Sequence, residues 1–445
     1  MREKLIRNSL FTSFDGAVNI HTDHQRPDRF RHIEMSFDNQ FRIARGGGYS
    51  FSAASFGEKK LVQEMSFFNR FIKFDPDHKA ITVEAGMSIG QLVSWVMKHN
   101  LYFPVLPGYP EITVGGCVAA DVHGKNPWKD GTFSDWVLEM KLFHPSFGYL
   151  KLTRDFNAEI FALTCGGFGL TGLIVEIKLQ LVDLTSNGFE VKKTPVASLT
   201  EATSKLTELS DQSDFIYSFH DGTGRGASFG QGIVLSGRWL LDKKMNMKAK
   251  VQSKIMTAQS RAKIPFSIWN RYTVGLGTKL FLSMNKMNLS QTIDVNKATF
   301  PFAYNTLYHR FFGRKGLAEV QVLVGNKTVE LFIQKLNELV NVQNPPLVMM
   351  SMKKFKGKQT SLSMSGSGFL IALNFYRDKN LSTFFESLDN LLIETSAQSN
   401  LSKDSRVSSS VITKTLPNYS SFNSRLSLFD PLRLYRSELS DRIGI

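Results

Sequence analysis

Three consecutive glycines, flanked by residues that suit an anionic ligand, are the first chemically informative feature of the chain. The run Arg45-Gly46-Gly47-Gly48-Tyr49-Ser50 follows an apolar stretch, residues 41–44, that predicts a strand. Glycine adopts positive φ angles and allows a close approach of backbone to ligand, and successive N–H groups in such a turn can form an anion-binding nest. Arg45 and Ser50 add donors for phosphate oxygens. The run therefore predicts a pyrophosphate-binding site, although a plain turn also explains it when it is taken alone.

Two further segments are rich in glycine and small residues, and both lie later in the chain. They cover residues 107–126 and 165–175. Between the first turn and these segments, residues 81–86 predict a strand that ends in glycine. Residues 88–100 then predict a helix with Ser88 as its N-cap and apolar residues at helical spacing. Small residues in three separate segments indicate a backbone that passes close to one long ligand.

Two common nucleotide-binding motifs are absent from the sequence. The dinucleotide fingerprint requires a glycine pattern that opens a helix, but Gly48 is followed by Tyr-Ser-Phe-Ser, a poor helix start. The phosphate loop requires Gly-Lys followed by Ser or Thr, but Gly124-Lys125 is followed by Asn126. The sequence therefore argues against an NAD dehydrogenase and against a nucleotide kinase.

The order of these parts resembles the flavin-binding half of the vanillyl-alcohol-oxidase (PCMH-type) flavoprotein superfamily. Within it, the chain is most similar to the decaprenylphosphoryl-β-D-ribose oxidase family, whose members bind FAD and oxidise the 2-hydroxyl of a lipid-linked ribose during an epimerisation. The resemblance is strongest in residues 40–180 and 400–445. The matching words are Thr113-Val114-Gly115-Gly116, Asp121-Val122-His123-Gly124-Lys125-Asn126, Gly169-Leu170-Thr171-Gly172, Ser402-Lys403-Asp404-Ser405-Arg406 and Asp430-Pro431-Leu432-Arg433.

The resemblance implies a set of cofactor contacts and a smaller set of residues around the reacting hydroxyl. Lys403 and His123 are the implied catalytic residues, and Gln321, Lys354 and Lys403 are the implied substrate contacts. Three positions depart from the family: Asn400 and Phe51 replace tyrosines, and Ala372 replaces a cysteine. The implied FAD contacts are Arg45, Gly46, Gly47, Gly48, Tyr49, Ser50, Gly108, Thr113, Val114, Gly115, Gly116, Ala120, Asp121, His123, Gly124, Asn126, Ile174 and Asn400.

Oxidation of a secondary alcohol requires a hydride acceptor and a group that receives the hydroxyl proton or stabilises the alkoxide. Lys403 would serve as a base if burial lowers its pKa, or as a cation beside the oxygen; alternatively it is a surface residue paired with Asp404. His123 either contacts the flavin or substrate, or is bonded only to backbone. Many superfamily members attach FAD through a histidine after the glycine turn. Because Tyr49 stands there, we expect noncovalent FAD.

Composition narrows the class of protein further. The 445 residues include only two cysteines, Cys117 and Cys165, and no metal-ligand spacing, so no metal site is expected. No signal-like or membrane-spanning run is present, which predicts a cytoplasmic protein. The net charge is +15, without a nucleic-acid-binding motif. Basic residues in the segment 243–263 indicate peripheral contact with the inner, anionic face of a membrane, or simply a solvated helix face.

The predicted fold class is α+β, with a two-part PCMH-type FAD-binding domain at residues 1–184 and an α+β substrate domain with an antiparallel sheet at 185–398. Residues 399–445 are expected to return to the first domain and pack across the cofactor. The expected partners are a small-molecule or lipid-linked sugar and a reductase that completes the epimerisation. An aldonolactone oxidase is an alternative, although the His-Trp-x-Lys motif of that family is absent from this sequence. A flavin-free binding protein is a third hypothesis.

Overall fold

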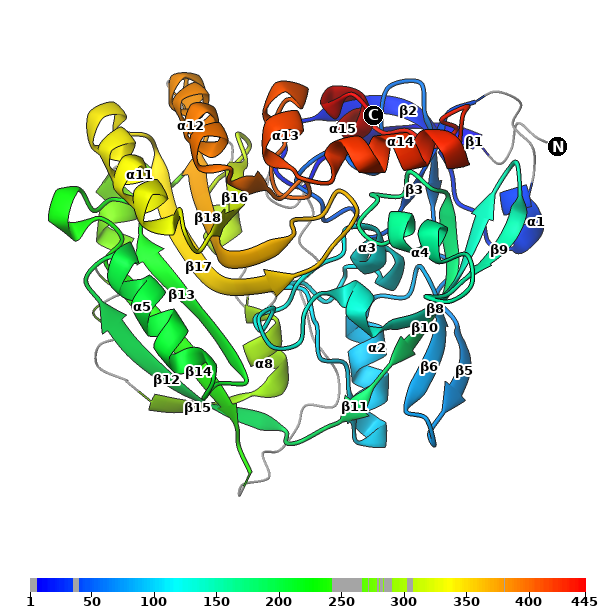
Figure 1. The fold of residues 1–445 in the computed structure, drawn as a ribbon, viewed down its shortest axis with the longest axis horizontal. Coiled ribbons are helices and arrows are strands. Elements are labelled where there is room, and N and C mark those ends of the chain that lie inside the picture. Colours follow the sequence, from blue (N-terminus) through cyan, green and yellow to red (C-terminus); the bar gives the residue numbers. More distant parts are fainter. Residues whose placement is uncertain are drawn as a thin grey trace.

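The computed structural model describes residues 6–34, 40–241, 266–270, 272–277, 280, 283, 290–301, 307–379 and 381–445. Helices and mainly antiparallel sheets in these residues confirm the α+β class. Two halves lie side by side: the N-terminal strands and small helices form one, and a large sheet with long helices forms the other (Figure 1).

Two large sheets and a small two-stranded one build the described part of the N-terminal half. The first has the order β1-β2-β4-β3, from β1 (Ile6–Thr12), β2 (Asn19–Gln25), β3 (Arg42–Arg45) and β4 (Leu61–Glu64), and β3 pairs in parallel with β4. The second has the order β5-β6-β10-β8-β9, from β5 (Phe71–Asp75), β6 (Ala80–Glu84), β8 (Val137–His144), β9 (Gly148–Leu152) and β10 (Leu173–Gln180). The first glycine turn thus follows β3 directly, as the sequence predicts.

Short helices connect these strands and seat the glycine-rich segments. The helix α2 (Ile89–Val96) begins at Ser88, whose hydroxyl accepts from Gln91 N in a capping box. Its apolar face, from Ile89 to Val96, is buried in the same core as α3 (Val114–Ala119) and β10. The remaining elements of this half are α1 (Phe30–Glu34), β7 (Leu101–Tyr102), α4 (Ala158–Thr164) and β11 (Val182–Asp183).

An eight-stranded sheet dominates the second half, in the order β15-β12-β14-β13-β17-β18-β16-β19. All its neighbouring strands are antiparallel. The strands are β12 (Gly188–Val196), β13 (Phe215–Asp221), β14 (Gly232–Trp239), β15 (Ser290–Asp294), β16 (Leu317–Gly325), β17 (Leu347–Gly357), β18 (Gly366–Tyr376) and β19 (Gln398–Ser399).

The helices α5 (Leu199–Ser210), α11 (Val329–Gln343) and α12 (Leu381–Thr395) cover one face of this sheet (Figure 1). The short helices α8 (Val295–Thr299) and α10 (Leu307–Arg310) lie between strands in the sequence. Side chains alternate between the two faces of a strand. On β16, Val320 and Val322 therefore join the helix-packed core, whereas Glu319 and Gln321 face the opposite side, toward the N-terminal half.

The C-terminal segment runs from the large sheet, where α13 (Ser409–Thr415) contacts α12 and β19, back to the N-terminal half, where α14 (Tyr419–Phe429) contacts α4; α15 (Glu438–Ile443) follows and packs on α13 (Figure 1). Its backbone continues the first sheet, because Arg42 N donates to Leu434 O and Arg436 N donates to Arg42 O, each at 2.9 Å. This segment also supplies residues 400–403, which lie between the two halves.

No described helix is long and apolar enough to cross a membrane. The basic segment 243–263, for which the sequence predicts membrane contact, lies outside the described residues.

Candidate functional site

A large cavity lies between the two halves, with a volume of about 330 Å³. This size falls within the usual range for ligand sites, roughly 300–1,000 Å³. All three glycine-rich segments line it, and so do strands β13, β16, β17 and β18 of the large sheet and residues 400–403 of the C-terminal segment. The cavity therefore joins residues that are more than 350 positions apart, such as Gly46 and Lys403.

The first glycine turn is packed so closely that larger residues do not fit. A Cβ atom on Gly46 would lie 2.2 Å from Thr113 Oγ1, and one on Gly47 would lie 2.5 Å from the Glu111 carbonyl oxygen. Gly48 has a φ of +72°, in the left-handed region that favours glycine. The turn thus presents its backbone at the cavity wall, beside Thr113, which caps α3 by accepting from Gly116 N.

Arg45 adds a half-buried cation to the cavity wall beside the glycine turn. Its Nη1 donates to Ser55 Oγ at 2.9 Å, and its guanidinium lies over the ring of Phe11 at 4.9 Å. Burial lowers the pKa of Arg45 to about 10, so the group remains charged at neutral pH. A half-buried positive charge beside a glycine turn is suited to a phosphate ligand.

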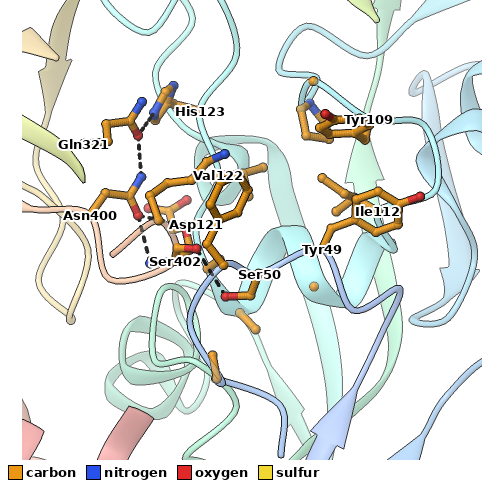
Figure 2. Close-up of a pocket in the computed structure, with 18 of the residues that line it drawn as sticks. Tyr49, Ser50, Tyr109, Ile112, Asp121, Val122, His123, Gln321, Asn400 and Ser402 are labelled. Carbon is orange, nitrogen blue, oxygen red and sulfur yellow. Dashed lines mark hydrogen bonds between the residues drawn. The ribbon is translucent and has the colours of Figure 1, made fainter. Parts of the chain in front are cut away.

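A chain of polar contacts connects the two halves along the cavity wall (Figure 2). His123 Nε2 lies 3.4 Å from Gln321 Oε1, which accepts from Asn400 Nδ2 at 2.6 Å. Asn400 Oδ1 accepts from Ser402 Oγ at 2.7 Å, and the Ser402 carbonyl accepts from Ser50 Oγ at 3.3 Å. The structure therefore brings four of the residues that the sequence singled out, His123, Gln321, Asn400 and Ser50, into one network.

His123 is a neutral side chain in this network. Burial, together with the positive charge of Lys353, lowers its pKa to about 3. Its Nδ1 lies 3.1 Å from the Gly124 carbonyl and its Nε2 lies 3.4 Å from Gln321 Oε1, and both oxygens can only accept, so the single proton of the neutral ring serves one of these two contacts. The other ring nitrogen is unprotonated, and the ring takes up a second proton poorly.

Lys403 lines the cavity, and Asp404 does not pair with it. Lys403 Nζ lies 3.4 Å from Glu319 Oε1 and 3.9 Å from the centre of the Phe51 ring. Asp404 is fully buried and accepts instead from the backbone N–H groups of Arg406 and Val407. The alternative of an exposed Lys403–Asp404 surface pair therefore does not describe this structure.

Three predicted site residues do not line this cavity. Val114, the first residue of α3, is fully buried, Asn126 donates to Pro104 O and Asp130, and Lys354 donates to Ser210 Oγ at 2.9 Å. Because side chains alternate along β17, it is Lys353 that faces the cavity, with Nζ 3.3 Å from the Gly124 carbonyl. The other predicted cofactor and substrate residues all line the cavity.

Sequence reasoning did not assign three charged residues of the cavity, Lys125, Glu319 and Lys353, to the site. Glu319 stands two positions before Gln321 on one strand, which is the only signal that could have found it, because such residues share a face. Lys353 follows the same rule with Ser351 and Phe355 on β17, but a run of two lysines leaves the choice of face open until the register is known.

The donor set and shape of this cavity fit FAD. A close-packed glycine turn and a half-buried arginine suit a pyrophosphate, and a long wall of small residues suits a flat, extended ligand. The two cysteines are both buried, and burial raises the pKa of each thiol well above its usual value.

Comparisons with known proteins agree with this geometry. Residues 38–148 match the FAD binding domain family. Over 412 residues the chain is 23% identical to decaprenylphosphoryl-beta-D-ribose oxidase of Mycolicibacterium smegmatis, and the match covers 91% of this chain and 89% of that protein.

Two plant proteins match a shorter part of the chain. The probable L-gulonolactone oxidase 4 of Arabidopsis thaliana is 30% identical over 28% of this chain and 23% of its own length. The L-galactono-1,4-lactone dehydrogenase 1 of Oryza sativa is 27% identical over 35% of this chain and 28% of its own length. The resemblance noted in the sequence is thereby confirmed, FAD is the cofactor, and the chain is an FAD-dependent oxidoreductase.

Proposed function

We propose that this enzyme oxidises a secondary hydroxyl of a sugar, and that the sugar is a pentose linked to a polyprenyl phosphate. The observation that carries the proposal is that Lys403, His123 and Gln321 line the same cavity as the glycine turn of the FAD site. When bound, FAD supplies the acceptor for a hydride. The residues of the chain must then orient the hydroxyl and manage its charge and proton.

Lys403 is the group proposed to stabilise the substrate oxygen as it loses its proton. Its ammonium is held by Glu319 at 3.4 Å and by the Phe51 ring, so it is fixed before substrate arrives. Such pre-positioned charge is among the largest contributions to catalysis. His123 and Gln321 offer a neutral acceptor and an amide for the neighbouring hydroxyls of a sugar.

FAD is proposed to be bound without a covalent bond. Tyr49 follows the glycine turn, and its hydroxyl donates to Glu111 Oε2 at 3.2 Å. His123 uses Nδ1 for the Gly124 carbonyl, and both cysteines are buried. Acid precipitation should therefore release all the yellow colour into the supernatant, and colour left in the pellet would contradict this assignment.

Apolar surface beside the cavity supports a lipid-linked substrate over a small free sugar. Tyr272, Leu276 and Leu280 are spaced four residues apart and are 84%, 72% and 60% exposed. Val274, between them, packs in the same apolar cluster as Phe51 and Tyr109, which line the cavity. Exposed apolar side chains at one helical spacing, next to a substrate cavity, suit contact with a membrane surface or a prenyl chain.

Oxidation of an aldonolactone is the second candidate function. Its support is the similarity to the two plant proteins named above, but this similarity covers only about a third of the chain, whereas the mycobacterial oxidase matches both halves. The large sheet carries Glu319, Gln321 and Lys353, so this half would contact the substrate. The match to the mycobacterial oxidase extends over this half as well, and this similarity favours the lipid-linked sugar.

Anaerobic reduction of the bound flavin separates the two candidates. The protein is mixed with polyprenyl-phosphate pentoses, with water-soluble pentose phosphates and with aldonolactones, and the loss of the flavin absorbance is followed. Rapid bleaching by a polyprenyl-phosphate pentose is expected. Bleaching by an aldonolactone alone would select the second candidate, and a colourless purified protein would favour a flavin-free binding protein.

A further inference from the structure

Lys353 is a cavity amine to which the proposed function has so far given no role. It lies on β17, and its Nζ is 3.3 Å from the Gly124 carbonyl, next to His123. Lys403 approaches the same space from the C-terminal segment, and the positive charge of each lysine is felt by His123. The amines of Lys353 and Lys403 therefore line the same part of the cavity, beside His123.

Glu319 makes these two lysines unequal. Its carboxylate pairs with Lys403 Nζ at 3.4 Å, and its side chain is only 10% exposed. Among the residues that the structure describes, Lys353 has no carboxylate at ion-pair distance. Of the two lysines, Lys403 is therefore the one with a carboxylate beside its amine.

The electrostatic surroundings of Lys353 favour its neutral form. Burial, reinforced by the charge of Lys403, lowers the pKa of Lys353 to about 8, and Glu319 opposes this shift only in part. At neutral pH a useful fraction of this amine is unprotonated. A lysine beside another cation is a known way to prepare a neutral amine.

The other titratable groups around Lys353 cannot easily take its place. His123, on the loop after α3, has a pKa of about 3 and holds a proton poorly. Burial, together with the charge of Lys353, lowers the pKa of Lys125 well below its usual value, but its amine is already engaged with the carbonyls of Ala298 and Thr299. Tyr217, on the neighbouring strand β13, has its pKa raised by burial. Lys353 is therefore the group with a proton affinity suited to neutral pH.

We propose that Lys353 accepts the hydroxyl proton of the substrate, that Lys403 stays charged beside the oxygen, and that Glu319 is the positioning residue that separates these roles. This inference rests on the proposed function. The O–H bond breaks as its proton passes to the neutral Nζ of Lys353. The carbon-bound hydrogen leaves with its electron pair to the FAD oxidant, and the C–O single bond becomes a carbonyl.

The first test compares Lys353→Met with Lys354→Met, its neighbour on the other face of β17. In the wild type and in Lys354→Met, anaerobic flavin reduction should speed up as pH rises through about 8, because the base becomes unprotonated. Lys353→Met should retain the flavin spectrum, lose this rise and react about 10²–10⁴-fold more slowly. Equal rates and equal pH profiles in the two variants would overturn the role of Lys353.

The second test measures the charge of Lys353 without catalysis. Competitive labelling with acetic anhydride over a range of pH, followed by peptide mass spectrometry, gives the midpoint at which each lysine becomes reactive. A midpoint near 8 is expected for Lys353, and Glu319→Gln should lower it by about one unit or more because a stabilising anion is lost. A midpoint near the ordinary lysine value of about 10.4 would overturn the proposal, and an unchanged midpoint in Glu319→Gln would overturn the role of Glu319.

The two tests also separate this proposal from the proposed function. A wild-type flavin that no sugar bleaches would contradict the proposed function itself. A wild-type flavin that is bleached normally, together with a Lys353→Met variant that is bleached equally fast, would contradict only the assignment of Lys353.

Discussion

At the scale of single residues, charge is distributed unevenly around the substrate end of the cavity. The sequence identified Lys403 through its Lys-Asp-Ser-Arg word, and the structure adds the direction of each side chain. Asp404 turns inward to Arg406, while Lys403 turns to Glu319 and the Phe51 ring. A neighbour in sequence is therefore not the electrostatic partner, and a one-dimensional pattern could not show which carboxylate pairs with the lysine.

Replacing Lys403 tests its part in the reaction. Lys403→Met removes the ammonium but keeps the length of the side chain, so FAD should remain bound and the flavin spectrum should not change. Loss of a positioned charge costs on the order of 3 kcal/mol in the transition state, or roughly a 10²-fold slower flavin reduction. Stopped-flow reduction measures this, with Lys354→Met as the control, and a wild-type rate in Lys403→Met would contradict the role.

The glycine turn makes a prediction about cofactor binding. In Gly46→Ala the added methyl group would stand 2.2 Å from Thr113 Oγ1, so the turn or the cap of α3 must move. FAD affinity should fall at least tenfold, measured by the recovery of flavin fluorescence on dilution. Gly275→Ala is the control, because a Cβ there meets nothing within 4 Å; equal FAD affinity in both variants would contradict a close-packed cofactor seat.

Lys353 shows why part of the site could not be predicted from sequence. The two adjacent lysines at 353 and 354 point to opposite faces of β17, and the choice depends on a register that is irregular between Leu347 and Met349. A slip of one residue exchanges the faces of a strand. Family similarity selected Lys354, whereas the sheet places Lys353 in the cavity and Lys354 at Ser210.

At the scale of elements, the predictions succeeded where the spacing of apolar residues agrees with a cap or a glycine at the end of the element. The strand that ends at Gly86 and the helix capped by Ser88 are present as β6 and α2. The hairpin of β1 and β2 and the long strand β17 were not anticipated. Their sequences carry polar or methionine-rich stretches without clean alternation, and pairing with neighbours decides their structure.

A buried pair, His144 and Asp430, joins the C-terminal segment to the N-terminal half. The two side chains are 0% and 1% exposed, and His144 Nε2 lies 3.4 Å from Asp430 Oδ2. Burial alone would raise the pKa of Asp430, but hydrogen bonds from His144 and from the backbone hold it below its usual value. A carboxyl with a lowered folded-state pKa stabilises the fold above its unfolded pKa of about 3.9, and this contribution is lost as pH falls through the folded value.

Asp430→Asn should therefore lower the melting temperature near neutral pH, and the difference from the wild type should shrink at about pH 3, where the wild-type carboxyl is protonated in the unfolded chain. The loss expected for a broken buried pair is about 3 kcal/mol or more. Thermal unfolding at both pH values measures it, with the exposed Asp155→Asn as the control. A constant difference at both pH values would contradict an ionised Asp430.

At the scale of the whole molecule, function depends on the closure of two halves over one cavity. The sequence predicted the α+β class and an FAD-binding half, because glycine turns and helix caps are local signals. It could not predict that four strands of the large sheet would face those turns, because this arrangement follows from packing between distant segments. The cofactor end of the site was thus more predictable than the substrate end.

Exposed apolar residues and the net charge of +15 together predict reversible binding to anionic membranes. Cosedimentation with anionic vesicles should weaken as salt rises, because exposed charges are screened within about 8 Å at physiological ionic strength. A variant with Tyr272, Leu276 and Leu280 replaced by serine should bind less. Leu428→Ser, at an exposed leucine of α14, should bind normally; sedimentation of the triple variant equal to this control would contradict the membrane contact.

The most direct test of the central claim is anaerobic reaction with a polyprenyl-phosphate pentose that carries deuterium on the carbon to be oxidised. The flavin should bleach more slowly with the deuterated than with the ordinary substrate, and the product should be a keto sugar without deuterium at that carbon, as seen by mass spectrometry. Bleaching at equal rates with a product that retains its deuterium, or no bleaching with either substrate, would contradict oxidation of this hydroxyl by hydride transfer.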